Sequence, residues 1–289
     1  YPDCSAEAFW AALPYMTYVT VGAAVTDGNT VRLLSGGKNV LGMVKTCGKS
    51  ILLRVSEADG RAISLPDEKR RTALAEKLAA VAKAEGCHGI TVAFYRTAKS
   101  APEDYRAFLL DMRKTLLGCD LILFTETDAN APAVEADFAD GDVLMYEKCV
   151  LPDIPSFADG EESVFRHFAD ITESSHMFID IPAFGYDNGE AVTREDIRKR
   201  LCRSKNRVTE DEKTGICRFS YTRFHGGPRE ERHVAFDSLK NIKAKFALAD
   251  ELGCMGIALD VGRTTTAVYA MINALFSRAE YPFLMTDNP

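Results

Sequence analysis

The fold of this chain is constrained most by a regular alternation between amphipathic helical patterns and short segments that are apolar throughout. Strands are predicted over the apolar segments, at residues 16–24, 50–56, 89–95, 120–126, 142–146, 177–183 and 256–261. Helices are predicted between them, at residues 39–47, 67–85, 102–117, 164–173, 194–202, 238–252 and 264–279. Continuously apolar strands are typical of parallel sheets that are covered on both faces. Strict alternation over 289 residues therefore predicts an α/β fold, a (β/α)8 TIM barrel, ahead of an open doubly wound sheet.

One polar stretch interrupts the alternation at about residues 204–232. It contains a strand-like run at 216–221 and the turn sequence Gly226-Gly227-Pro228. We interpret it as a small hairpin-like insertion before the last strand, within a single domain that covers residues 1–289. Without it, the regular strands number one fewer than a complete barrel needs. Either the run at 216–221 joins the barrel, or a first strand lies at or before Tyr1 and is cut short.

Composition and charge narrow the functional classes. No apolar run approaches the roughly 18 residues that span a membrane, so no membrane span is expected. A net charge of −7 argues against nucleic acid as a partner. The cysteines include no C-x-x-C pair, and no glycine-rich phosphate loop follows a strand, so neither a metal nor a cofactor is predicted. We expect the thiols to be free and structural, which disfavours a strongly oxidising compartment.

Several segments of the chain resemble one known family. Residues 84–96, AEGCHGITVAFYR, resemble the fourth barrel strand of family 18 glycoside hydrolases, the chitinase-like enzymes, whose signature there is DGxDxDxE. Residues 15–24 (YMTYVTVGAA) resemble the second strand of that family, 144–147 (LMYE) the M-x-Y-D of its sixth, and 177–186 (MFIDIPAFGY) its seventh. The segment 233–262 resembles the closing part of the barrel. The resemblance covers most of the chain and is nearest to the bacterial cell-wall and spore-cortex enzymes.

The acidic signature itself is lost. Laid on DGxDxDxE, the four acidic positions fall on His88, Thr91, Ala93 and Tyr95. In the family, the terminal Glu protonates the leaving oxygen, and a neighbouring Asp orients the substrate N-acetyl group as the internal nucleophile. A phenol at position 95, with a pKa near ~10, is a poor proton donor at neutral pH, and the side chain of Ala93 cannot hydrogen-bond. The resemblance therefore implies a chitinase-like pseudoenzyme, since losing general acid catalysis alone costs about 10²–10⁴-fold in rate.

An active glycosidase remains an alternative, because other carboxylates stand at predicted strand ends. They are Glu57, Glu126, Asp128, Glu147 and Asp260. In a barrel such groups converge on one mouth, where a pair about 5–9 Å apart could perform ordinary acid–base glycoside chemistry. Glu126, Glu147 and Asp260 are the candidate replacements for the lost acids. The competing interpretation is that these carboxylates cap helices or lie solvated at the rim.

Aromatic residues near strand ends are the candidate glycan contacts, since sugar rings pack against aromatic faces. They are Phe94, Tyr95, Tyr146 and Tyr186, of which Tyr146 matches the acetamido-binding Tyr of the family. Arg54 lies in an apolar strand and needs a partner if it is buried. Glu57 or another carboxylate at the mouth would serve, so Arg54 and Glu57 are added to the candidate ligand site. Arg263 is placed to pair with Asp260 or to bind an anionic ligand.

These residues together predict a non-hydrolytic barrel that binds a glycan containing N-acetylglucosamine, such as chitin or peptidoglycan fragments. The resemblance implies a cell-envelope or extracellular location, whereas free cysteines favour the opposite. A structural envelope or spore protein without a sugar ligand is the other alternative. An open groove lined by Phe94, Tyr146 and Tyr186 would favour glycan binding. A mouth plugged by Arg54, for example paired with Glu57 or Asp260, would favour the structural role.

Overall fold

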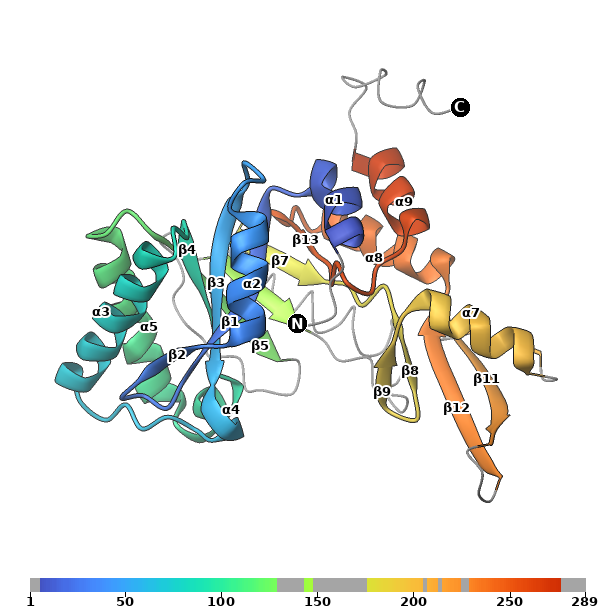
Figure 1. The fold of residues 1–289 in the computed structure, drawn as a ribbon, viewed down its shortest axis with the longest axis horizontal. Helices are drawn as coiled ribbons and strands as arrows, with labels where there is room; N and C mark the ends of the chain where they lie inside the picture. The colour runs from blue at the N-terminus through green and yellow to red at the C-terminus, as the bar shows by residue number, and fades with distance from the viewer. Residues whose placement is uncertain are drawn as a thin grey trace.

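The computed structural model describes residues 6–128, 143–147, 176–204, 207–212, 215–224 and 229–276. The parallel strands of its larger sheet (Figure 1) are β1 (Tyr18–Thr26), β3 (Ser50–Glu57), β4 (Gly89–Ala93), β5 (Ile122–Asp128), β6 (Val143–Glu147), β7 (Met177–Asp180) and β13 (Gly256–Ala258). Short antiparallel β2 (Val31–Leu33) pairs with the end of β1. The order β13-β7-β6-β5-β4-β3-β1-β2 means that each parallel strand is hydrogen-bonded to the next one along the chain. This order has no reversal, which is the winding of a barrel rather than of a doubly wound sheet.

Helices flank these strands, and the periodicity predicts most of them but not those at residues 6–12 and 95–100. They are α1 (Ala6–Ala12), α2 (Ser35–Val44), α3 (Glu68–Ala84), α4 (Tyr95–Ser100), α5 (Pro102–Leu117), α8 (Leu239–Glu251) and α9 (Thr266–Phe276), with 3-10 turns η1 (Leu13–Tyr15) and η2 (Ala58–Gly60). The side chain of Asp67 accepts from the N–H of Arg70 at 2.9 Å, and that of Ser238 accepts from the N–H of Asn241 at 3.1 Å. Both caps satisfy N–H groups that the start of a helix leaves unpaired. The predicted helix at 164–173 lies outside the described residues.

The elements at the two ends of this sheet order meet. α1 and η1 precede β1, whereas α9 follows β13 (Figure 1). The rings of Tyr15 in η1 and Tyr269 in α9 stack with their centroids 5.6 Å apart. The sheet therefore curls until its first and last helical elements touch, as a barrel requires.

Side chains alternate between two apolar layers along the parallel strands. Outward-facing residues such as Leu53 are buried in the main core, against the helices. Inward-facing Leu52 and Phe124 form a second, smaller cluster, with Tyr18 and Phe178 packed against it. Because side chains on a strand repeat with a period of two, Arg54 and Glu126 share the inward face with Leu52 and Phe124. The candidate site thus lies inside the barrel.

Helix α2 packs so closely on β1 that one of its glycines has no room for a side chain. A Cβ on Gly37 would lie 2.3 Å from the Cα of Ala23, whereas nothing lies within 4 Å of a Cβ on Gly42. Gly37→Ala is expected to lower the free energy of unfolding by about 1–3 kcal/mol, because helix and strand must move apart. Gly42→Ala is the control in the same helix and should raise that free energy by up to about 1 kcal/mol. Urea denaturation measures both, and equal effects would contradict this close packing.

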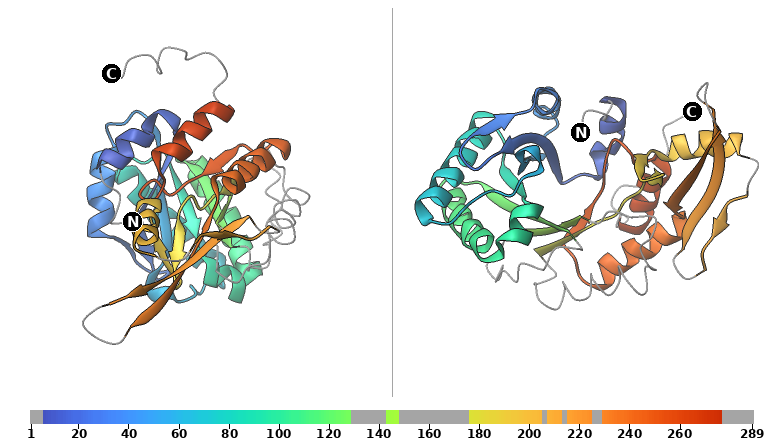
Figure 2. Two further views of the ribbon diagram at one scale, coloured as in Figure 1. Left: turned by 90° about the vertical axis from the view of Figure 1, so that its right-hand side faces the viewer. Right: turned by 90° about the horizontal axis from the view of Figure 1, so that it is seen from below.

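A second, antiparallel sheet is formed by the part of the chain between β7 and β13 and lies to one side of the barrel (Figures 1 and 2). Its order is β10-β11-β12-β8-β9, formed by β8 (Gly185–Asp187), β9 (Glu190–Val192), β10 (Thr209–Glu210), β11 (Ile216–Arg223) and β12 (Glu230–Asp237). Helix α7 (Arg194–Arg203) contributes Ile197 to a small core with Val192, Phe219 and Val234. The ribbon of β11 and β12 projects away from the barrel (Figure 2).

The predicted hairpin at about 204–232 is present but is part of a larger insertion. The hairpin is formed by β11 and β12, and the same sheet also contains β8 and β9, which begin at residue 185. The run at 216–221 therefore does not join the barrel. β8 and β9 have three residues each, which is too short for a periodic pattern to reveal.

The described cysteines are free thiols: Cys47, Cys87, Cys119, Cys202, Cys217 and Cys254. Burial raises the pKa of Cys87 and of Cys254 to about 11, so both thiols are protonated at neutral pH. Among the helices that the structure describes, none combines the length and apolarity of a bilayer span. Within the same residue ranges, no cluster of His, Cys, Asp or Glu is arranged to hold a metal ion.

Candidate functional site

The candidate site occupies inward-facing positions of β3, β4 and β5. Arg54 in β3 is in register with Thr91 in β4, and Thr91 is in register with Phe124 in β5. Two residues further along each strand, the inward positions are Ala93 in β4 and Glu126 in β5. Arg54 and Glu126 therefore flank the strand that has lost its acids, with the small side chain of Ala93 between them.

Arg54 and Glu126 form an ion pair across β4. The Nε of Arg54 donates to both carboxylate oxygens at 2.8 and 2.9 Å, and its Nη2 donates to Oε2 at 2.7 Å. The side chain of Glu126 is 2% exposed and that of Arg54 is 17% exposed. Charge-assisted hydrogen bonds of this kind are short and strong, and burial makes either partner costly to remove. Glu126 is thus a carboxylate partner of Arg54, whereas the examples predicted from the sequence were Glu57 and Asp260.

Tyr95 completes an interior cluster of Arg54, Glu126 and Tyr95. Its hydroxyl donates to Oε2 of Glu126 at 2.6 Å, and the Nη2 of Arg54 donates to the same hydroxyl at 3.5 Å. Tyr95 is the first residue of α4, because β4 ends at Ala93, two residues before its predicted end. The residue at the family's acid position therefore directs its proton to a carboxylate of the protein itself.

Glu57 holds the start of the helix that carries Tyr95. Its Oε1 accepts from the N–H and the hydroxyl of Thr97 at 2.6 and 2.7 Å, and its Oε2 accepts from the N–H of Arg96 at 3.1 Å. A carboxylate at a helix N-terminus satisfies unpaired N–H groups and interacts favourably with the helix dipole. Glu57 therefore caps α4 and helps to fix the start of this helix at Tyr95.

The strand that has lost its acids offers little to acid–base hydrolysis. Ala93 has no polar side-chain atom, and the buried hydroxyl of Thr91 has no hydrogen-bond partner among the described residues. Both oxygens of Glu126 accept hydrogen bonds, from Arg54 or from Tyr95, so this carboxylate has no proton to donate in this arrangement. A general acid must deliver a proton to the leaving oxygen. In the interior cluster, the carboxylate of Glu126 is thus engaged by Arg54 and by Tyr95.

Phe94 and His88 lie at the two ends of this strand, and their described contacts are with residues outside the interior cluster. Phe94 is fully buried in the main core, with its ring centroid 5.7 Å from that of Phe108. His88 precedes β4, and its Nδ1 accepts from the N–H of Ile51 at 3.1 Å. Both residues thus join β4 to its neighbours.

Tyr146 and Glu147 are the last residues of β6. The backbone of β6 pairs with β5 and β7, which places both residues at the carboxyl end of the sheet. Their side chains lie outside what the structure describes. A glycan contact by Tyr146 and a catalytic role of Glu147 stay predictions.

A group of aromatic and charged side chains links the start of the insertion to the segment that follows β13. Asp260 accepts from the Nη1 of Arg263 at 2.8 Å, as predicted. The guanidinium of Arg263 lies over the ring of Phe184, 5.3 Å from its centroid. The ring of Tyr186, in β8, lies 5.6 Å from that of Phe184. Asp260 and Tyr186 are thus brought to one place, on elements other than those of the interior cluster.

No protein-family profile matches this chain, and no curated protein matches its sequence. Solved structures do match. The chitinase from Chromobacterium violaceum ATCC 12472 has a TM-score of 0.78 at 18% identity, over 92% of this chain and 93% of that one. The spore cortex-lytic enzyme SleL of Bacillus megaterium QM B1551 has a TM-score of 0.78 at 19% identity, over 93% of this chain and 69% of that one. YKL-39, solved in the presence of chitooligosaccharides, has a TM-score of 0.69 at 12% identity, over 90% and 87%. This chain has the chitinase barrel fold.

The predicted TIM barrel and the resemblance to chitinases and spore-cortex enzymes are therefore confirmed at the level of the fold. The strand order without reversal agrees with this assignment. In this chitinase-like barrel, the interior cluster occupies the carboxyl-terminal half of the interior, where barrel enzymes place their chemistry.

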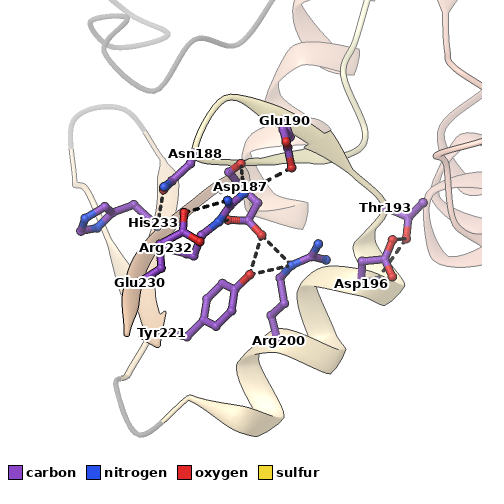
Figure 3. A network of polar contacts seen from close by, with 10 residues as sticks. All are labelled: Asp187, Asn188, Glu190, Thr193, Asp196, Arg200, Tyr221, Glu230, Arg232 and His233. Carbon is purple, nitrogen blue, oxygen red and sulfur yellow. Dashed lines mark hydrogen bonds and ion pairs between the residues drawn. The ribbon is translucent and has the colours of Figure 1, made fainter. Parts of the chain in front are cut away.

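The insertion of the chitinase-like barrel is held by a polar network around Asp187 that the sequence patterns did not predict (Figure 3). The fully buried carboxylate of Asp187 accepts from the Nε of Arg200 at 2.7 Å, the hydroxyl of Tyr221 at 2.6 Å and the Nε of Arg232 at 2.9 Å. Burial alone would raise the pKa of Asp187. The hydrogen bonds from Tyr221 and Arg232, with the charges of Arg232 and Arg200, outweigh burial and lower the pKa below its usual value.

A second network fixes the insertion to the barrel. Arg194 donates from Nε to the carbonyl of Ala183 at 3.0 Å and from Nη2 to the carbonyl of Asp237 at 2.5 Å, the points where the chain leaves and rejoins the barrel. The carboxylate of Asp237 accepts from the Nζ of Lys245 at 2.6 Å and from the Nδ2 of Asn241 at 2.7 Å. The side chains of Lys245 and Asp237 are 2% and 1% exposed. A buried ion pair thus joins the last strand of the insertion to α8.

Proposed function

We propose that this protein is a non-hydrolytic, chitinase-like barrel that binds glycans containing N-acetylglucosamine, of the chitin or peptidoglycan type. The observation that carries the proposal is the interior cluster of Arg54, Glu126 and Tyr95. It puts a phenol, already bonded to Glu126, at the position of the family's general acid, and alanine at the orienting position. Losing the general acid alone costs about 10²–10⁴-fold in rate. Hydrolysis by the family mechanism is not expected.

The glycan part of the proposal is supported by the likeness of fold. YKL-39 was solved in the presence of chitooligosaccharides, and the other two neighbours are a chitinase and a spore cortex-lytic enzyme. Barrels of this type place ligand contacts at the carboxyl ends of their strands. We propose Tyr146, at the carboxyl end of β6, as an aromatic contact, together with Tyr186 of the insertion and with Tyr95 and Arg54 of the interior cluster.

A structural role without a sugar ligand is the second candidate, and one observation favours it. The buried pair of Arg54 and Glu126 fills the interior in the way expected of such a protein, although with a different carboxylate. A pair of this kind holds β3, β4 and β5 in position whether or not a glycan occupies the mouth.

Calorimetric titration with chitohexaose, together with a chromogenic chitobioside assay, tests the proposal. We expect binding without turnover. Tyr146→Phe should weaken binding by about three- to tenfold through the loss of one hydrogen bond, whereas Tyr15→Phe, which precedes the first strand of the sheet, should bind like the parent. Turnover that falls in Glu126→Gln or Glu147→Gln would establish the active alternative. If the protein shows neither binding nor turnover, that result would favour the structural role.

A further inference from the structure

The insertion carries a basic surface that is not part of the proposed glycan site at the barrel mouth. Residues 198–207, RKRLCRSKNR, contain six lysines or arginines and no acidic residue, in a chain whose net charge is −7. The run starts inside α7 and continues past the end of that helix at Arg203. Runs of this kind are typical of surfaces that bind polyanions.

The described cations of this run are exposed, except Arg200, which is partly buried against Asp187. Helix α7 turns Ile197 and Leu201 toward that core. Arg198, Lys199 and Arg207 are exposed. The helix therefore has an apolar inner side and a basic outer side.

Arg200 is held in an orientation that suits an anion. Its Nε donates to Asp187 at 2.7 Å and to the hydroxyl of Tyr221 at 3.2 Å, and its side chain is 25% exposed. Both contacts use Nε, and no residue in the described ranges engages the terminal Nη groups, which point away from Asp187 (Figure 3). A guanidinium fixed through one edge presents the other as a planar fork that matches a carboxylate, sulfate or phosphate.

We propose that the outer side of α7, with Arg198, Lys199 and Arg200, together with Arg207 beyond the end of the helix, binds an acidic polysaccharide. The side chain of Lys199 also lies 2.8 Å from that of Glu195, but both are more than half exposed, so this pair opens at little cost.

The acidic residues that border the run decide which polyanion fits. They are Glu195 and Asp196 before it and residues 210–212 after it. They confine the positive potential to a short patch, because charges beyond about 8 Å are screened at physiological salt. Double-stranded DNA carries one charge per ~1.7 Å of its axis and would be repelled by these acids as well as attracted by the cations. A polysaccharide with one carboxylate per disaccharide can place its charges on the cations alone.

Hyaluronate, which alternates N-acetylglucosamine with glucuronate, is the probe. The parent protein should bind immobilised hyaluronate at low salt and release it as salt rises. The triple variant Arg198→Gln/Lys199→Gln/Arg207→Gln should bind at least about tenfold more weakly, because its contacts to carboxylates are lost. The matched control Arg32→Gln/Lys69→Gln/Arg70→Gln removes the same charge from exposed positions on β2 and α3, and should bind like the parent.

Equal weakening in the two triple variants would show that net charge acts rather than this surface, and would overturn the proposal. Absent binding to hyaluronate, or tighter binding to a single-stranded oligodeoxynucleotide of similar length, would overturn it too. Chitohexaose binding should be the same in both triple variants and the parent. The proposal of a glycan site at the barrel mouth and the proposal of a basic binding surface on α7 are therefore tested separately, and either can be wrong without the other.

Discussion

Glu126→Leu is expected to lower the free energy of unfolding by about 3–5 kcal/mol, because it leaves the guanidinium of Arg54 without its carboxylate inside the barrel. Glu126 is 2% exposed at its side chain and accepts three hydrogen bonds from Arg54. The hydroxyl of Tyr95 also loses the acceptor of its 2.6 Å hydrogen bond. Guanidinium chloride denaturation followed by circular dichroism measures the change.

The double variant Arg54→Met/Glu126→Leu distinguishes the cost of an unpaired buried charge from the cost of losing the ion pair itself. Two apolar side chains fill similar space without burying a charge, so the double variant should be more stable than Glu126→Leu alone. Lys45→Met is a surface control, since Lys45 pairs with Glu85 at 3.2 Å but is 41% exposed, and should cost less than about 1 kcal/mol. A Glu126→Leu effect as small as that of Lys45→Met would mean that Arg54 is not confined by the barrel.

The barrel could be predicted from the sequence because its signals are local. Each cap contacts an N–H three residues away, from Asp67 to Arg70 and from Ser238 to Asn241, and each parallel strand is a continuous apolar run. The insertion gave weaker signals. β8 and β9 have three residues each, too short for a periodic pattern, and β12, which pairs with β8, starts only at Glu230. The Asn188-Gly189 turn between β8 and β9, with both residues at positive φ, is a local hairpin signal, but it does not reveal the pairing with β12.

The interior cluster was predictable only in part. The strand period gives the inward positions of Arg54, Ala93 and Glu126, but the choice of Glu126 as partner depends on the register of strands that are 72 residues apart in the chain. The apolar pattern ran on to Tyr95, yet α4 begins there because Glu57 supplies a cap from another strand. A tertiary contact thus overrode the local strand pattern.

Asp187→Asn is expected to lower the free energy of unfolding by about 3 kcal/mol at neutral pH, because it removes the buried charge that Arg200 and Arg232 share. The matched control is Glu190→Gln, which removes another partner of Arg232, 3.2 Å from its Nη2 but 74% exposed. That substitution should cost less than about 1 kcal/mol.

The pH dependence of this difference tests the lowered pKa of Asp187. In the unfolded chain the carboxyl titrates near pH ~3.9, and in the folded protein it titrates below that value. Its ionised form therefore contributes stability above about pH 4, and the contribution is lost as the pH falls through the lowered folded-state pKa. Parent and Asp187→Asn should differ most near neutral pH and converge in acid, because a protonated carboxyl and an amide are both uncharged. Denaturation curves from about pH 7 to about pH 2 measure this, and a difference that stays constant over that range would mean that Asp187 does not stabilise the insertion through its charge.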